Sequence, residues 1–151
     1  MKQVAIQGVA GAYHDIAARA YFEGEEIKTI DCLTFKDVFS AIQQGEDMLG
    51  IIAIENTIAG SLLQNHNLLR ENETSVIGEI KLRISHCLAA LPGQTIADIH
   101  EVGSHPMALM QCQDFLSSHT HWKAVEKDDT ALTAKEISLN QTKGAAAICS
   151  E

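Results

Sequence analysis

Short apolar runs alternate with stretches of helical periodicity in the first part of the chain. The runs predict strands at residues 4–7, 26–30 and 48–54. After the first two runs, apolar residues recur every three or four positions, which is typical of a helix packed on a sheet. The predicted buried faces are Tyr13, Ile16, Ala17 and Ala20 in the first helix, and Phe35, Val38, Phe39 and Ile42 in the second. This alternation predicts a parallel sheet with right-handed crossovers.

Residues that start and stop helices flank the second periodic stretch. Thr34, with Asp37 three positions later, forms a partial capping box and predicts a helix start. Gly45 follows the last apolar position, and we expect it in the left-handed conformation, which favours glycine at a helix end.

The run at residues 51–54 is apolar throughout and ends abruptly in polar residues. It predicts a buried parallel strand, because it is too short for most helices and too apolar for a surface. The polar and turn residues that follow are Glu55, Asn56, Thr57, Gly60 and Ser61. They stand at the carboxyl end of the strand, where ligands bind in open α/β sheets. An amphipathic helix is expected at residues 62–69, and an ordinary strand-to-helix loop without chemistry is the alternative interpretation.

Residues 74–91 have the pattern of extended structure whose character changes midway. The apolar positions that alternate with polar ones in its first half are Ile80, Leu82 and Ile84. Residues 88–91 are continuously apolar and predict a fully buried end. A strand of this kind suits a passage between lobes, so we predict one α/β lobe at residues 1–82 and a second at 83–151.

The second half repeats the alternation of strand and helix without a sequence repeat. Strands are predicted at residues 99–103, 122–126 and 145–149, and helices begin near Pro106 and Asp129. Proline suits the first helical position, and an aspartate is a favoured N-cap. The inner face of the first of these helices is Leu109, Cys112 and Leu116.

The net charge of the chain bears on the kind of partner that it binds. A net charge of −9 over 151 residues, with lysine and arginine scattered, argues against a nucleic-acid interface. A small molecule is the expected partner. If it is an anion, backbone N–H groups at helix starts or a few well-placed cations must attract it against the overall field.

Other features exclude further classes. No apolar run is long enough for a membrane span, and the N-terminus enters a strand without a signal-peptide layout, which predicts a cytoplasmic protein. The cysteines are widely spaced in apolar contexts without a CxxC pair, which favours buried reduced thiols over disulfides or a zinc site. They are Cys32, Cys87, Cys112 and Cys149. No metal and no cofactor is expected.

The turn after the first strand is a candidate ligand loop. Gly8 and Gly11 allow close approach of the backbone to a ligand at a helix start, but Ile6 and Ala10 break the dinucleotide fingerprint. A nucleotide fold is therefore a weaker alternative, supported by Asp31 where a ribose-binding acid would stand.

Further candidates follow strands in the second half. Ser104, His105 and Thr130 could face the same crevice as the residues of the first half. His105 is interpreted either as a proton carrier or, as is more frequent for a histidine just before a helix, as a group that caps the helix or orients a ligand. The other histidines lack metal-ligand spacing, although His119 and His121 could chelate weakly.

Four motifs occur in order along the chain. They are GVAGAY at residues 8–13, IENTIAGS at 54–61, SHPMALMQC at 104–112, and DTA at 129–131 followed by GAAAI at 144–148. In these motifs the sequence resembles the prephenate dehydratase family of phenylalanine biosynthesis, over essentially the whole chain. The resemblance implies a two-lobed α/β fold like that of type 2 periplasmic binding proteins. Each lobe would hold an open, mostly parallel sheet, with the substrate between the lobes. The implied reaction converts prephenate to phenylpyruvate, carbon dioxide and water.

The resemblance also implies roles for residues. Glu55 and Asn56 would orient the substrate near the reacting ring, and Gln111 would make a polar contact in the pocket. The implied substrate-binding residues are Gly11, Tyr13, Thr57, Gly60, Ser61, Ser104, His105, Thr130 and Ala131. Glu55 could act as a general acid if burial raised its pKa, but an ionised glutamate would repel a dianion.

The sequence departs from the family pattern in places. His14 stands where a serine usually follows the tyrosine, and Met107 where a glutamine usually follows the proline. The family's Thr-Arg-Phe segment and C-terminal regulatory domain do not occur in these residues, whose last arginine is Arg83. We therefore expect the front part of a catalytic domain, with both lobes incomplete and inactive alone. The family commonly pairs, so a homo-oligomer is expected.

Two other function classes remain open from the sequence. A non-catalytic module of the same fold that binds a small anion would need the crevice but no proton donor. A nucleotide-binding oxidoreductase is the third interpretation. Formation of phenylpyruvate from prephenate separates the first two classes, and NADH binding tests the third.

Overall fold

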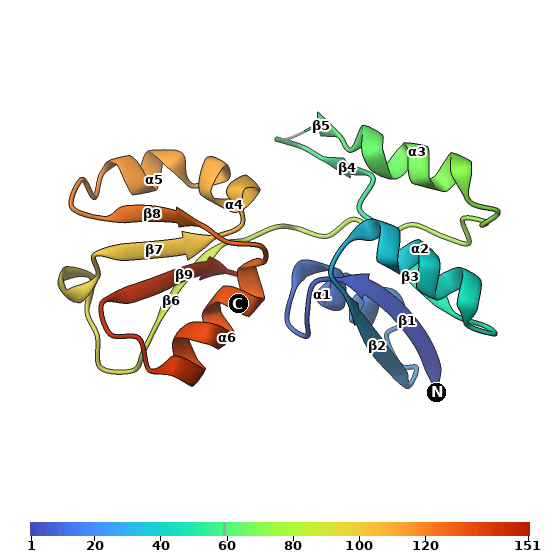
Figure 1. Ribbon diagram of the computed structural model, residues 1–151, viewed down its shortest axis with the longest axis horizontal. Coiled ribbons are helices and arrows are strands. Elements are labelled where there is room, and N and C mark those ends of the chain that lie inside the picture. The colour runs from blue at the N-terminus through green and yellow to red at the C-terminus, as the bar shows by residue number, and fades with distance from the viewer. Residues whose placement is uncertain (59) are drawn as a thin grey trace. The chain divides into compact units, whose positions relative to one another are not determined.

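The computed structural model describes residues 1–58 and 60–151, so Ala59 of the second motif lies outside the described residues. The chain divides into two compact units, Met1–Arg83 and Ile84–Glu151. Each unit has its own sheet, and helices cover both faces of each sheet (Figure 1).

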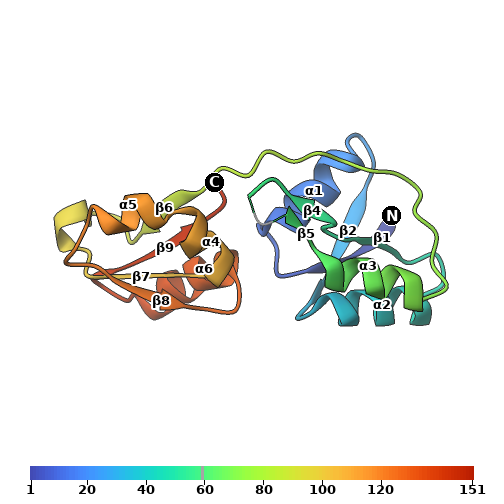
Figure 2. The ribbon, with the colours of Figure 1, turned by 90° about the horizontal axis from the view of Figure 1, so that it is seen from above.

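The first unit is built on a parallel sheet of strand order β2-β1-β3. Its elements are β1 (Lys2–Gln7), α1 (Tyr13–Tyr21), β2 (Ile27–Cys32), α2 (Phe35–Gln44), β3 (Leu49–Ile51), β4 (Glu55–Asn56), β5 (Gly60–Ser61) and α3 (Leu63–Glu71). Figure 2 shows α1 on one side of the sheet, and α2 with α3 beside it on the other. The predicted parallel sheet is confirmed in this unit.

The central strand β1 is apolar on both faces because both are covered. Val4 and Ile6 pack with Ala18 of α1 and with Phe22, the residue after this helix. The residue between them, Ala5, packs on the opposite face with residues that include Val38 of α2. Because side chains alternate along a strand, those of β1 pack into two separate cores, one on each face of the sheet.

The predicted helix ends are partly confirmed. Thr34 and Asp37 form a complete capping box at the start of α2. The expectation for Gly45 is wrong, because its φ of −100° is extended and the left-handed residue in this turn is Asp47, at φ 59°. On α1, Ala20 was predicted on the buried face but is exposed, and Asp15 is buried. A hydrogen bond from the Gly11 N–H holds the Asp15 carboxylate against the turn before the helix.

The predicted strand over residues 48–54 is only partly correct. β3 ends at Ile51, and the residues from there to Ile54 are half-buried and outside any strand. Their backbone bonds to the start of α3 instead of to the sheet. The Ala53 carbonyl accepts from Asn65 Nδ2 at 2.7 Å, and the Ile54 carbonyl accepts from the Leu62 N–H at 2.9 Å. Glu55 therefore lies in a separate hairpin and not at the tip of a parallel strand.

The second unit holds a four-stranded sheet of order β6-β9-β7-β8. Its elements are β6 (Cys87–Ala90), a 3₁₀ turn (Ile96–Asp98), β7 (Glu101–Ser104), α4 (Pro106–Gln111), α5 (Gln113–Ser117), β8 (Lys123–Glu126), α6 (Thr130–Asn140) and β9 (Ala145–Cys149). β6 runs antiparallel to β9, and β9, β7 and β8 are parallel. The predicted strand at residues 145–149 coincides with β9.

Two different layers cover this sheet (Figure 1). Val102, Ala146 and Ile148 pack with Leu109 of α4, and Cys112 and Leu116 lie against this cluster, as predicted. On the other face α6 lies against β9, β7 and β6. A Cβ on Gly103 would stand 2.9 Å from Thr133 Cγ2, so glycine allows α6 to approach β7 closely.

The prediction of a long extended strand at residues 74–91 is wrong for most of its length. Among the described residues a strand begins only at Cys87, and Ala90, expected in a fully buried segment, is exposed. β6 is an edge strand that pairs on one side with β9. An edge strand is covered less completely than a central one, which explains its half-buried residues.

Candidate functional site

The turn after β1 lies at the carboxyl end of the first sheet. The Gly8 N–H donates to the Cys32 carbonyl at 2.9 Å, which fixes the start of the turn beside the end of β2. Gly11 has φ 86° and open space where a Cβ would stand, so its backbone conformation, not crowding, favours glycine. Tyr13 is half-buried at the first position of α1. The predicted ligand loop therefore exists as a fixed turn leading into a helix.

Asp15 holds this turn and was not predicted as a site residue. Its Oδ2 accepts from the Gly11 N–H at 3.1 Å and from Arg19 Nε at 2.9 Å. Burial raises the pKa of the Asp15 carboxyl, but hydrogen bonds from Arg19, Gly11 and Thr29 outweigh it and lower the pKa overall. An acid in the first turn of a helix with an arginine four residues later was the available sequence signal.

The polar residues after β3 form a hairpin of β4 and β5. Glu55 stands opposite Ser61, and Asn56 stands opposite Gly60. Asn56 Oδ1 accepts from the Ile58 N–H at 2.9 Å and so stabilises the bend of the hairpin. Glu55, Ser61 and Thr57 are exposed. The structure thus brings five predicted residues of the first unit together on one hairpin, where three of their side chains face solvent.

Ser104 ends β7, and its side chain lies in the core. It is fully buried, and its Oγ donates to the Ile148 carbonyl of β9 at 2.6 Å. His105 follows as the N-cap of α4, where its Nδ1 accepts from the Met107 N–H at 3.2 Å. This hydrogen bond confirms the capping interpretation of His105 and requires Nδ1 to be unprotonated.

Thr130 and Ala131 begin α6. The Asp129 carboxylate caps the helix by accepting from the Leu132 N–H at 2.8 Å, and Thr133 Oγ1 donates to the Asp129 carbonyl at 2.6 Å. Thr130 is buried, and its position at the helix start makes backbone N–H groups available to an anion.

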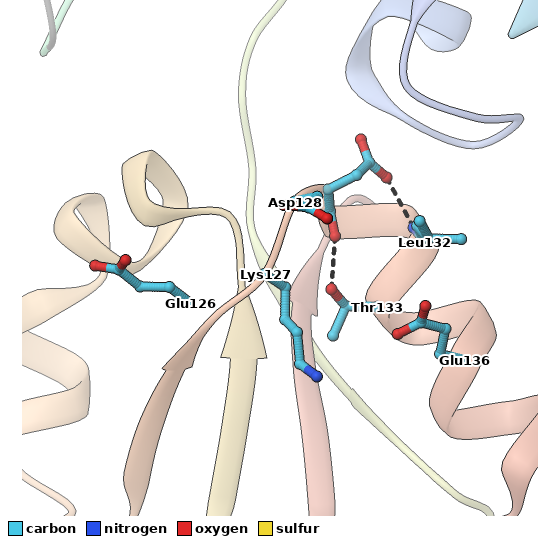
Figure 3. A pocket seen from close by; sticks show the side chains of 7 residues that line it. Glu126, Lys127, Asp128, Leu132, Thr133 and Glu136 are labelled. Atoms are coloured by element: carbon cyan, nitrogen blue, oxygen red, sulfur yellow. Dashed lines mark hydrogen bonds between the residues drawn. The ribbon is translucent and has the colours of Figure 1, made fainter. Parts of the chain in front are cut away.

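A hollow of about 230 Å³ lies beside this helix start. Its lining residues are Glu126, Lys127, Asp128, Asp129, Leu132, Thr133 and Glu136 (Figure 3). Four carboxylates against one lysine make it acidic, so it does not suit a dianion.

Gln111 lies at the opposite end of α4 from Ser104. Its Oε1 and His86 Nε2 are 2.7 Å apart, which joins the helix end to the residue before β6. Helical rise places the two ends of α4 roughly 8 Å apart. The structure therefore does not bring Gln111 to the same helix end as Ser104 and His105.

A second hollow, of about 340 Å³, is apolar and lies in the first unit. The residues that line it include those of β3, Tyr21 at the end of α1 with Phe22 after it, Phe39 and Ile42 of α2, and residues 73–77. None of the residues predicted as site residues is among those that line it.

Two features of the described residues bear on the partners of the protein. Across residues 1–58 and 60–151, no group of three or more histidine, cysteine, aspartate or glutamate side chains is placed to hold a metal ion. In the same residues, no helix has both the length and the apolar character that crossing a membrane requires.

Comparison with known proteins gives consistent results. A family model described as prephenate dehydratase matches residues 4–151. The chain is 37% identical over 149 residues to "Arogenate dehydratase/prephenate dehydratase 2, chloroplastic" of Arabidopsis thaliana, covering 99% of this chain and 38% of that protein. The chain therefore spans well under half the length of this curated relative.

Two solved structures share the fold. A prephenate dehydratase from Arthrobacter aurescens in complex with L-Phe superposes with a TM-score of 0.86 at 22% identity, over 98% of this chain and 50% of that one. A structure described as "GqqA- a novel type of quorum quenching acylases" superposes with a TM-score of 0.84 at 33% identity, over 99% of this chain and 54% of that one. The mixed α/β architecture with parallel sheets is thus that of prephenate dehydratase structures.

Proposed function

The chain belongs to the prephenate dehydratase family, and from this we propose that the protein converts prephenate to phenylpyruvate. The match of the family model over residues 4–151 is the observation that carries the proposal. Prephenate loses its ring carboxylate as carbon dioxide while its ring hydroxyl leaves as water, and the ring becomes aromatic. The protein has to hold a dianion, supply a proton to the hydroxyl and keep water from the departing carboxylate.

Groups for holding the substrate are supplied by both units in this proposal. In the first unit, Glu55 and Asn56 orient the substrate, and Ser61 stands across the hairpin from Glu55. In the second unit, we assign the backbone N–H groups of Thr130 and Ala131 at the start of α6 to a carboxylate, since those of Leu132 and Thr133 already bond to Asp129. Because the fully buried Ser104 hydroxyl donates to the Ile148 carbonyl, we assign Ser104 to joining β7 with β9 and not to binding the substrate.

The proposal extends to the arrangement of the units. We infer that they are the two lobes of a fold like that of type 2 periplasmic binding proteins, with the substrate between them. The separate sheets, each with polar residues beyond the carboxyl ends of its parallel strands, support this inference. A homo-oligomer is part of the same proposal.

Acyl hydrolysis is a second candidate, favoured by the 33% identity to the structure described as an acylase. A serine nucleophile needs an adjacent base that accepts its proton. Ser104 and His105 are neighbours in sequence, but the serine donates to the Ile148 carbonyl, and the histidine Nδ1 accepts from a backbone N–H. This geometry favours the dehydratase over an acylase built on these two residues.

The decisive experiment is turnover by the full-length gene product that contains this chain. We expect prephenate to yield phenylpyruvate and carbon dioxide in equal amounts. Arogenate is run in parallel, because the Arabidopsis relative is named for both substrates. An acylated amine tests the second candidate. Binding of prephenate without any product would establish the non-catalytic module instead, and absence of both binding and turnover would contradict the proposal.

A further inference from the structure

Cys87 and Cys149 face each other across two neighbouring strands. Cys87 is the first residue of β6 and Cys149 the last residue of β9, and they are directly paired in the antiparallel ladder. Directly opposed residues in such a ladder have Cα atoms about 4.5 to 5.5 Å apart. Disulfides join Cα atoms about 4.4 to 6.8 Å apart, so this pairing meets their backbone requirement.

The two thiols lie on the same face of the sheet. Their ladder neighbours Leu88 and Ile148 belong to the apolar cluster beneath α4. Because side chains alternate along a strand, Cys87 and Cys149 point to the opposite face, which α6 covers. Burial raises the pKa of the Cys149 thiol, and the nearby Cys87 raises it further.

The two thiols differ in exposure to solvent, and this sets the order in which an oxidant reaches them. Cys149 is buried, whereas Cys87 is half-buried on the edge strand. A small oxidant therefore meets Cys87 first, and Cys149 can attack from the position opposite. Both cysteines are reduced in the structure.

We propose that Cys87 and Cys149 are an oxidation site that forms a reversible disulfide between β6 and β9. With a low-molecular-weight disulfide as oxidant, the Cys87 thiolate attacks one sulfur and releases one small thiol. The Cys149 thiolate then attacks the Cys87 sulfur of the mixed disulfide and releases the second small thiol. The protein loses two protons and two electrons, and the two electrons reduce one small disulfide to two thiols.

The disulfide would fasten an edge strand to a central one. β6 pairs within its sheet through β9, so the bond closes a long loop through the second unit. Closing such a loop restricts the unfolded chain and stabilises the fold. The bond also adjoins Ile148, whose carbonyl accepts from Ser104 at the end of β7. This inference does not depend on the proposed function.

The test is oxidation of the native wild-type protein with glutathione disulfide. Samples are quenched in acid, alkylated in denaturant without reductant and mapped by mass spectrometry. We expect two of the four thiols to become inaccessible to the alkylating reagent, with Cys87 and Cys149 in one cross-linked peptide and Cys32 and Cys112 alkylated. A reductant should restore all four. The oxidised protein should also unfold at a higher urea concentration than the reduced protein.

Two matched cysteine variants test whether the cross-link depends on Cys87. Cys112→Ser removes another half-buried thiol of the same unit and should leave the cross-link intact, whereas Cys87→Ser should abolish it. Glutathione retained on Cys87 with Cys149 still alkylated would overturn the proposal, as would a bond from Cys87 to Cys112. The wild-type peptide map decides these outcomes by itself, even if a variant fails to fold.

Discussion

The Ser104 hydroxyl donates to the Ile148 carbonyl at 2.6 Å and so joins the ends of two parallel strands, β7 and β9, within the core. Ser104→Ala leaves this acceptor without that bond, and we expect a loss of about 1–3 kcal/mol in the free energy of unfolding. Urea unfolding followed by the fluorescence of Trp122, the sole tryptophan, measures it. Ser117→Ala, at an exposed position of α5, is the control. Unchanged stability with weakened prephenate binding would instead make Ser104 a ligand group.

Gly103 allows α6 to lie close against β7. Gly103→Ala places a Cβ 2.9 Å from Thr133 Cγ2, and overpacking of this kind costs about 1–3 kcal/mol. Thr133→Ser removes that methyl group while keeping a hydroxyl that can donate to the Asp129 carbonyl. We therefore expect the double variant to recover most of the stability lost by Gly103→Ala, measured by the same fluorescence. An additive double variant would show that the close contact is not the cause.

The capping box of α2 tests the first unit separately. Thr34→Ala removes the acceptor for the Asp37 N–H, and we expect a loss of about 1 kcal/mol. Because Trp122 lies in the other unit, hydrogen exchange of the β1 amides is the suitable measurement. Thr34→Ser keeps the cap and should exchange like the wild type. Equal exchange in the alanine variant would contradict the prediction.

Local chemistry made parts of the fold predictable from sequence. β9 is apolar at every position and covered on both faces, so its residues identify it without long-range information. The run at residues 51–54 is equally apolar, yet its carbonyls bond to Asn65 and Leu62 at the start of α3. That competition depends on where α3 lies in space, which periodicity does not encode. The strand prediction there was wrong for this reason.

The candidate site was also only partly predictable from the sequence. Polar residues after strands were predictable because ligands bind at strand ends, but the direction of each side chain was not. Ser104 points into the core and His105 caps a helix. Asp15 was missed because the buried face of the first helix was predicted from apolar residues alone. That pattern included Ala20, which is exposed, and left out the buried Asp15. The pairing of Cys87 with Cys149 depends on strand register, and spacing in the sequence gave no sign of it.

The hairpin of β4 and β5 contains the two residues whose substitution we expect to lower activity. In the full-length gene product, the double variant Glu55→Ala, Asn56→Ala should lower kcat by about 100-fold if these residues orient the substrate. Asn56 also bonds to the Ile58 N–H, so circular dichroism has to show that the variant is folded. Gln64→Ala, at an exposed position of α3, is the control. Near-native turnover by the double variant would rule out the assignment.

Asp15 gives the pH dependence of the first unit. Its folded-state pKa lies below the ordinary value of 3.8. The stability that it contributes is therefore fully present above the pKa of the unfolded chain and is lost as the pH falls through the folded-state pKa. Asp15→Asn keeps the shape of the side chain but removes the charge that bonds to Arg19. We expect the variant to be less stable at neutral pH.

The difference between wild type and variant should shrink as the pH falls below about 4, because the Asp15 carboxyl then takes up a proton, first in the unfolded chain and at lower pH in the folded one. Urea unfolding followed by circular dichroism at a series of pH values measures it. Asp31→Asn, which changes an exposed aspartate at the end of β2, is the control for general loss of charge. A difference that stays constant across the acid range would mean that Asp15 acts through packing alone. A shrinking difference shows that the ionised carboxylate holds the Gly11 turn, because only the charged form accepts from both Gly11 and Arg19 with full strength.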